Sequence, residues 1–154
     1  MLDPAQFTKH IIRPALEAID LYSEAAAELL LGTAIQESRL TYLKQIGGGP
    51  ALGVFQMEPA TEDDIWENFI LYRGALDQKV LGLMVTKHAL GDGLIWNLYY
   101  AAAMCRIHYY RVSEALPAAG DISRQAEYWK AHYNTPLGAG TEAEYIENWH
   151  KYSG

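Results

Sequence analysis

The sequence predicts a mainly α-helical protein, folded as one domain over residues 1–154, with a central buried helix and a small Gly-rich loop or β-hairpin region beside a cleft. Three observations lead to this prediction. Capping residues precede several segments in which apolar residues recur at helical spacing. Residues 94–116 form a long apolar-rich segment typical of a core helix. Residues 47–50, Gly-Gly-Gly-Pro, exclude a stable helix interior.

The N-terminal half begins with a strong helix start. Asp3 is a candidate N-cap followed by Pro4 at the first helical position, and this helix is expected to run to about Asp20. Ser23 caps a second helix, whose apolar run covers residues 25–40. After the Gly-rich stretch, residues 53–57 (GVFQM) are expected to form either a small strand or a turn that lines a cleft.

The next helices are predicted from turn and cap signals. Pro59 and Thr61 open a helix with Thr61 as the N-cap, and the acidic residues 62–64 fall in its first turn, where the helix dipole favours them. Residues 78–90 look helical and are followed by Gly-Asp-Gly at 91–93. The central helix is predicted over residues 94–116, ended by Pro117.

The C-terminal part contains two shorter helices. Asp121 or Ser123 is expected to cap a helix that runs to about His132, with a loop over residues 133–138. Thr141 and Glu144 form a capping box for a last helix that ends near Tyr152.

Composition limits the classes of partner. Half of the 154 residues are hydrophobic, which suits one sizeable core. The net charge of −7 argues against a nucleic-acid partner. Cys105 is the only cysteine, so an intrachain disulfide is excluded, and its place in the central helix predicts a buried, inert thiol.

The N-terminal residues lack a basic segment followed by an apolar one, so we expect no signal peptide and synthesis in the cytoplasm. The longest uncharged run, residues 93–105, is too short to cross a bilayer, and we expect no membrane insertion.

Glu37 is the strongest candidate for chemistry. It shares a helix face with apolar or small neighbours at positions 30, 33, 34 and 40. A carboxyl group desolvated in this way has a raised pKa, as a general acid near neutral pH requires. The alternative is that Glu37 ends its helix and turns outward to water.

Other chemistries find little support in the sequence. The five histidines are scattered, with no pair at HExxH spacing, so no metal site is predicted. The glycines at 47–49 are not followed by the Lys-Ser/Thr pair of a phosphate-binding loop, and no G-x-S-x-G elbow is present.

Several short motifs together resemble the soluble lytic transglycosylase family of the lysozyme-like superfamily. Glu37-Ser38 resembles the family's Glu-Ser pair, and Gly53-Val54-Phe55-Gln56 with Pro59 and Thr61 is similar to its Gly-Leu-Met-Gln and Pro-x-Thr motifs. Tyr133-Asn134 is similar to its later Ala-Tyr-Asn-Ala-Gly, and Asn97-Leu98 with the alanines 101–103 resembles its central helix. The similarity spans roughly residues 24–150.

The sequence departs from the family pattern in two respects, which concern the expected shape of the glycan groove and the expected origin of the protein. Val54-Phe55 replaces Leu-Met, and Thr135-Pro136-Leu137 follows Tyr-Asn where the family has Ala-Gly. The expected lack of a signal peptide is more similar to phage-encoded members, acting at the cell wall or periplasm after delivery by a phage particle or through a holin.

The resemblance implies a lysozyme-like helical domain that cleaves the β-1,4 bond between N-acetylmuramic acid and N-acetylglucosamine in peptidoglycan glycan strands. We expect the protein to be a monomer. Glu37 would act as acid and then base, giving a 1,6-anhydro product without any metal or organic cofactor. Tyr133 would hydrogen-bond and orient Glu37, and Ser38 would help to position the glutamate or the substrate. Gln56, the backbone around Phe55, and Asn134 would contact or support the substrate.

Three alternatives remain at this point. A hydrolytic muramidase would use a second carboxylate, for which Glu58, Asp63 and Asp64 are candidates. A catalytically silent member of the same fold would bind glycan or serve as a virion structural module. A small helical protein–protein adaptor would show an exposed apolar face and no cleft.

Overall fold

The computed structural model describes residues 1–84 and 92–154, and within these ranges the protein is mainly helical, as predicted. The helical elements are, in chain order, α1 (Pro4–Phe7), η1 (Thr8–Ile12), α2 (Arg13–Ala18), α3 (Glu24–Ser38), α4 (Pro59–Asn68), η2 (Ile70–Tyr72), α5 (Gly74–Leu83), α6 (Gly93–Trp96), α7 (Leu98–Tyr110), α8 (Ile122–Trp129), η3 (Lys130–Asn134) and α9 (Glu142–Tyr152).

The first predicted helix forms as α1, η1 and α2 in succession, ending at Ala18. Its predicted cap is confirmed, because Asp3 Oδ1 accepts a hydrogen bond from the backbone N–H of Gln6 at 2.8 Å. The middle segment η1 is a π-helical turn that ends at Ile12, two residues before Pro14. Proline has no N–H to donate and its ring crowds the carbonyl four residues earlier, which the wider turn accommodates.

Helix α3 is buried over most of its length. Its predicted cap is confirmed, with Ser23 Oγ accepting from Ala26 N–H at 3.0 Å. The helix ends at Ser38, two residues before the end of the apolar run, because Arg39 and Leu40 adopt positive φ angles of 52° and 51°. The reversal leaves Glu37 in the last turn of a buried helix.

The prediction of one central helix over residues 94–116 is wrong in its bounds. Helix α6 ends at Trp96, α7 begins at Leu98 and ends at Tyr110, and the segment up to Pro117 is not helical. Asn97 makes the break, since its Oδ1 caps α7 by accepting from Tyr100 N–H at 3.0 Å and its Nδ2 donates to the Leu83 carbonyl at 2.8 Å. Helix α7 is nonetheless buried, including the Cys105 thiol.

The Gly-rich region is a loop rather than a hairpin. Isolated bridges pair Lys44 with Leu52 and Leu52 with Met57, and no extended strand forms in residues 1–84 or 92–154. Of the two predicted alternatives for residues 53–57, a small strand or a turn, the structure has the turn. Gly53 has a φ of 74°, and a Cβ at this position would collide with the Leu94 carbonyl oxygen, so only glycine fits.

Two helix starts differ from the predictions. Helix α4 begins at Pro59 with Glu58 as the N-cap residue, so Thr61 lies inside the first turn and is not the cap. Helix α5 begins at Gly74, before the predicted start at residue 78. The end of the predicted 78–90 helix lies outside the described residues.

The C-terminal helices follow their capping signals. Asp121, and not Ser123, caps α8, with Oδ1 accepting from Arg124 N–H at 3.1 Å. Helical structure continues through the π-helical turn η3 to Asn134, so Tyr133 and Asn134 are not in a loop as predicted. The Thr141–Glu144 capping box of α9 is confirmed.

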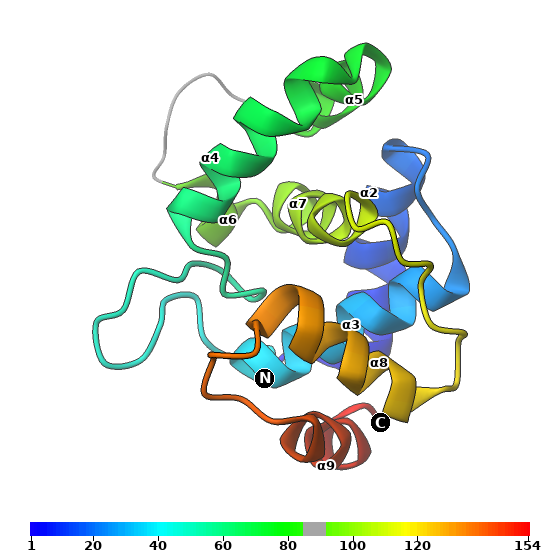
Figure 1. Cartoon of the computed structure of the whole chain (residues 1–154), viewed down its shortest axis with the longest axis vertical. Helices are drawn as coiled ribbons and strands as arrows, with labels where there is room; N and C mark the ends of the chain where they lie inside the picture. Colours follow the sequence, from blue (N-terminus) through cyan, green and yellow to red (C-terminus); the bar gives the residue numbers. More distant parts are fainter. Residues whose placement is uncertain (85–91) are drawn as a thin grey trace.

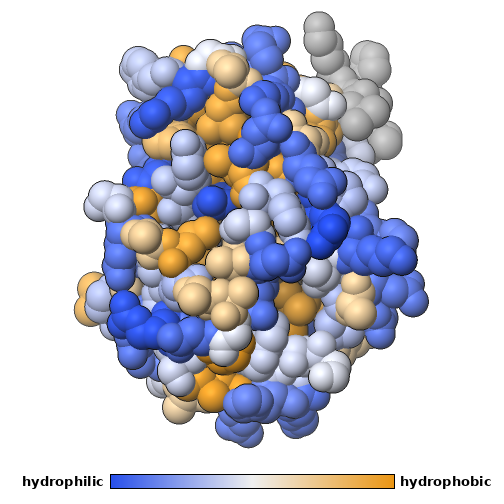
Figure 2. Space-filling model, turned by 90° about the vertical axis from the view of Figure 1, so that its right-hand side faces the viewer, coloured by the Kyte–Doolittle hydropathy of each residue, from blue (hydrophilic) through white to orange (hydrophobic). Residues whose placement is uncertain are grey.

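The helices gather around α3 and α7, which lie in the middle of the molecule (Figure 1). Helices α8 and α9 pack on α3 and on each other, whereas α4 and α5 pack against α7 at the other end. The segment between α3 and α4 projects from one side as two adjacent loops (Figure 1). Figure 2 shows a different face, on which hydrophilic side chains surround smaller hydrophobic patches.

Candidate active site

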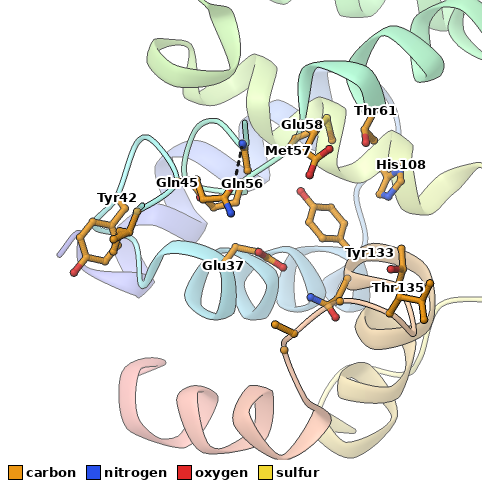
Figure 3. A pocket seen from close by; sticks show the side chains of 17 residues that line it. Glu37, Tyr42, Gln45, Gln56, Met57, Glu58, Thr61, His108, Tyr133 and Thr135 are labelled. Atoms are coloured by element: carbon orange, nitrogen blue, oxygen red, sulfur yellow. Dashed lines mark hydrogen bonds between the residues drawn. The ribbon is translucent and has the colours of Figure 1, made fainter. Parts of the chain in front are cut away.

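A pocket with a volume of about 700 Å³ opens beside the C-terminal turn of α3. Its walls are the loop between α3 and α4, the start of α4, one position of α7, and η3 with the loop that follows it (Figure 3). The lining residues are Glu37, Tyr42, Gln45, Ile46, Ala51, Gln56, Met57, Glu58, Thr61, His108, Tyr133, Asn134, Thr135, Leu137, Gly138, Ala139 and Gly140.

Glu37 is an ionisable pocket residue whose pKa this setting changes strongly. Burial raises the pKa of its carboxyl group to about 7, and the hydrogen bond from Trp129 partly offsets this rise. Trp129 Nε1 donates to Glu37 Oε1 at 2.9 Å. The Glu37 carboxyl group therefore lies in the pocket wall with its Oε1 held by Trp129, and near neutral pH it exists in both the protonated and the ionised form.

The sequence does not predict any role for Trp129 in the site. It lies on α8, 92 positions after Glu37, and is 1% exposed. Its only sequence signal is its place on the apolar side of a short helix, which indicates burial but gives no partner.

Ser38 is not among the residues that line the pocket. Its hydroxyl group is buried, donating to the carbonyl oxygens of Ala34 at 3.1 Å and Val54 at 2.7 Å. The bond to Val54 ties the end of α3, next to Glu37, to the Gly53 turn, and Ser38 has no contact with the pocket itself.

Tyr133 lines the pocket but makes a different hydrogen bond from the one expected. Its hydroxyl group donates to the Phe55 carbonyl oxygen at 2.6 Å, whereas Glu37 is held by Trp129. The Tyr133 ring stacks on Tyr109 with centroids 5.4 Å apart and meets His108 edge-on at 5.1 Å. Figure 3 shows the Tyr133 ring and the Glu37 carboxyl group facing the same space.

Phe55 belongs to the core and not to the pocket lining. Its ring is 2% exposed and packs 6.1 Å from the Phe7 ring. Its carbonyl oxygen accepts the hydrogen bond from Tyr133, so the Phe55 backbone supports a residue of the pocket wall. The Phe55 side chain thus lies outside the pocket, while its backbone contacts Tyr133, which lines it.

Gln56 and Asn134 both line the pocket, as the prediction of substrate-contacting residues requires. Gln56 has a φ of 48°, and its Nε2 donates to the Gly53 carbonyl oxygen at 2.8 Å. Asn134 Oδ1 accepts from Lys130 Nζ at 2.7 Å. Each side chain is held by these bonds at the edge of the cavity.

Among the three candidate second carboxylates, Glu58 alone lines the pocket. It stands at the start of α4, across the cavity from Glu37 (Figure 3). Asp64 instead pairs with Arg111 at 2.6 Å, and Asp63 is exposed on α4.

His108 is the pocket residue whose pKa shift the sequence did not predict. Burial lowers its pKa to about 4, with a further contribution from the Arg111 charge. The ring nitrogen Nδ1 lies 3.2 Å from Arg111 Nη2. His108 is therefore a neutral, hydrogen-bonded ring at neutral pH.

The lining has a distinct electrostatic character. Its ionisable residues are Glu37, Glu58, His108 and two tyrosines, with neither lysine nor arginine among the described lining residues. Amide groups of Gln45, Gln56 and Asn134 supply hydrogen-bond donors and acceptors. Such a surface suits an uncharged, polar ligand rather than a phosphate or another anion.

Residues 1–84 and 92–154 contain no group of three or more His, Cys, Asp or Glu side chains arranged to hold a metal ion. No helix within these ranges has both the length and the apolar character needed to cross a membrane. Comparison of the chain with protein-family models, with curated proteins and with solved structures finds no match.

Proposed function

We propose that this protein is a peptidoglycan lytic transglycosylase with a lysozyme-like helical domain, cleaving the β-1,4 bond between N-acetylmuramic acid and N-acetylglucosamine. The observation that carries the proposal is the half-buried Glu37 carboxyl group, with a pKa of about 7, in the wall of a 700 Å³ pocket. A group with this pKa exists in both protonation states at neutral pH, as one residue that acts first as acid and then as base requires.

In the proposed reaction, protonated Glu37 gives its proton to the glycosidic oxygen as that bond breaks. Positive charge then develops at the anomeric carbon of the N-acetylmuramic acid. The Glu37 carboxylate next removes the proton from the C6 hydroxyl group of the same sugar, whose oxygen attacks the anomeric carbon. The products are a 1,6-anhydro sugar and a free glycan end, and Glu37 regains its proton.

The pocket lining supports a glycan as the ligand. Sugar hydroxyl and N-acetyl groups need neutral donors and acceptors, which Gln45, Gln56 and Asn134 provide. Tyr42 and Ile46 add apolar surface at the rim, against which the apolar face of a sugar ring can pack.

A hydrolytic muramidase is the second candidate, and Glu58 is the observation that favours it. Hydrolysis requires a carboxylate that attacks the sugar or activates water, and Glu58 shares the pocket with Glu37. The transglycosylase route needs only Glu37. A glycan-binding or virion structural module would use the pocket without chemistry.

The test is digestion of purified peptidoglycan with wild-type protein and with the variants Glu37→Gln and Glu58→Gln. Mass spectrometry of the released muropeptides, before any reduction step, separates the two reactions. Anhydro products, lighter by one water, are expected from wild-type protein and from Glu58→Gln. Glu37→Gln should release none, because its amide cannot transfer the proton.

Each other outcome points to a different function. Hydrated products that depend on Glu58 would replace the transglycosylase proposal with a muramidase. Glycan binding without any release would indicate the silent module. Release of products by folded Glu37→Gln would remove Glu37 from the mechanism altogether.

In vivo, we propose that the protein acts as a monomer at the cell wall or in the periplasm, after delivery by a phage particle or through a holin.

A further inference from the structure

The indole N–H of Trp129 reaches Glu37 from a helix far away in sequence. Nε1 lies 2.9 Å from Glu37 Oε1, and the tryptophan is 1% exposed, so water does not reach this donor easily. Within residues 1–84 and 92–154, Trp129 is the one hydrogen-bond partner of the Glu37 carboxyl group. Trp129 does not itself line the pocket.

The Trp129 ring is held in place from two sides. The Tyr145 ring of α9 packs against it, with centroids 5.4 Å apart and planes inclined by 34°. Gly140, in the loop before α9, lies so close on another side that a Cβ there would collide with the indole. A rotation of the indole would therefore need movement of α9 or of this loop.

Helix α3 has a matching feature. A Cβ at Gly32 would collide with the Tyr145 hydroxyl group, so a glycine on α3 allows Tyr145 to approach. Asn148 Nδ2 also donates to Gln36 Oε1 at 2.7 Å, next to Glu37 in sequence. Thus α9 is fastened to the same helix that carries the glutamate.

We propose that Trp129 is a positioning residue for Glu37 and that α9 braces it, which directs the transferable proton of Glu37 into the pocket. An indole N–H is a donor only and has no acceptor. It therefore cannot share a proton carried on Oε1, and the acidic proton resides on Oε2. The catalytic part of this inference rests on the proposed function. The hydrogen bond between Trp129 and Glu37 is tested without assuming that function.

The titratable groups around Glu37 belong to several elements. Cys105 and Tyr109 of α7 and Tyr133 of η3 interact with its charge, and burial raises the pKa of all three above their usual values. These groups stay neutral around pH 7. Glu58 at the start of α4 and His108 of α7 line the same pocket.

The first test uses wild-type protein, so it does not depend on a variant that folds. In protein labelled with ¹⁵N at its four tryptophans, one indole N–H signal is expected to shift with a midpoint near pH 7 as Glu37 ionises. The same signal should stay constant over this range in Glu37→Gln. If no indole signal titrates in this way, the proposal is overturned.

The second test is Trp129→Phe, which removes the donor and retains an aromatic ring. The N–H stabilises the carboxylate, so the pKa of Glu37, measured by ¹³C NMR of its carboxyl carbon, should rise by about one pH unit. Trp66→Phe on α4, which removes an indole donor bonded to Tyr100, is the matched control and should leave the Glu37 pKa unchanged. An unchanged or lowered pKa in Trp129→Phe would overturn the proposal.

Kinetics then connect the geometry to catalysis. In Trp129→Phe, kcat should fall about tenfold because the acid is less well oriented, while KM changes little because Trp129 lies outside the pocket lining. The alkaline limb of kcat/KM should move upward together with the Glu37 pKa. If wild-type protein releases no muropeptides, the proposed function fails, and the two NMR measurements still decide the role of Trp129.

Discussion

At the residue scale, burial shifts two pocket side chains so that both favour their neutral forms. It raises the pKa of Glu37 to about 7 and lowers the pKa of His108 to about 4. Because one group is an acid and the other a base, their contributions to the pH dependence of stability have opposite signs. The wild-type protein should therefore show a shallow stability profile between pH 4 and pH 7, which two single variants can separate.

Glu37→Gln is expected to show the acid's contribution. A folded-state pKa above the unfolded one means that the stability due to protonated Glu37 is complete below about pH 4.5 and is lost as pH rises to about 7. The variant lacks this loss, so its stability relative to wild type should increase over this window by up to about 3 kcal/mol. Urea unfolding at several pH values measures it. A pH-independent difference would contradict the raised pKa.

His108→Gln is expected to show the opposite trend. A folded-state pKa below the unfolded one gives stability that is present above about pH 6.5 and lost as pH falls towards 4. The free energy of unfolding of the variant, relative to that of wild type, should therefore increase by up to about 3 kcal/mol as pH falls through this range. The same urea titrations measure this difference. His10→Gln, on the exposed side of η1, is the control and should follow wild type.

At the element scale, the loop between η3 and α9 owes its shape to one lysine. Lys130 Nζ donates to Asn134 Oδ1 and to the Gly138 carbonyl oxygen, both at 2.7 Å. A Cβ at Gly138 would collide with Asn134, so the loop turns tightly around that side chain. This loop forms the pocket wall next to η3, and its apex residue Leu137 is 99% exposed.

Lys130→Met should loosen this wall without unfolding the protein. Hydrogen exchange at residues 135–140 should become faster, and the free energy of unfolding should fall by about 1 kcal/mol as two charge-assisted hydrogen bonds are lost. KM for glycan should rise more than kcat falls. Lys9→Met, an exposed position on η1, is the control. Unchanged exchange in the loop would show that Lys130 does not hold it.

At the scale of the whole molecule, the charge of the chain and the character of its pocket differ. The net charge is −7, whereas the described pocket lining contributes two carboxyl groups, and the pKa of Glu37 is raised to about 7. Long-range repulsion from an anionic cell wall would slow the approach of such a protein, but it would not weaken contacts with the glycan itself.

Salt should therefore raise the rate on whole cell walls that carry anionic polymers. The Debye length falls from about 30 Å at 0.01 M salt to about 8 Å at 0.15 M, so repulsion is screened. Turbidity clearing should become faster over this range, while cleavage of short, purified glycan strands should change little. Slower clearing of whole walls as salt increases would show that attraction, not repulsion, governs the encounter.

The elements whose signals are local were predicted best. Asp3, Ser23 and Thr141 each cap a helix because a side-chain oxygen lies a few residues from the N–H groups that it accepts from, and this distance is fixed by the sequence. The boundaries that failed depend on distant parts of the chain. Asn97 breaks the predicted central helix while also bonding to Leu83, 14 positions earlier.

The residues of the pocket also divide into those predicted from local signals and those whose contacts depend on distant parts of the chain. The sequence by itself determined that Glu37 shares a helix face with apolar residues, because helix periodicity is a local property. Whether its carboxyl group is desolvated, which raises its pKa, was decided by the tertiary packing. The sequence motifs also named Gln56, Tyr133 and Asn134 as candidate site residues, and all three line the pocket. The tertiary structure alone decided that Trp129 binds Glu37, that Tyr133 binds the Phe55 carbonyl, and that Ser38 faces the core. Those partners are set by how whole helices pack, and a helix surface offers several residues at similar positions, so periodicity cannot select among them.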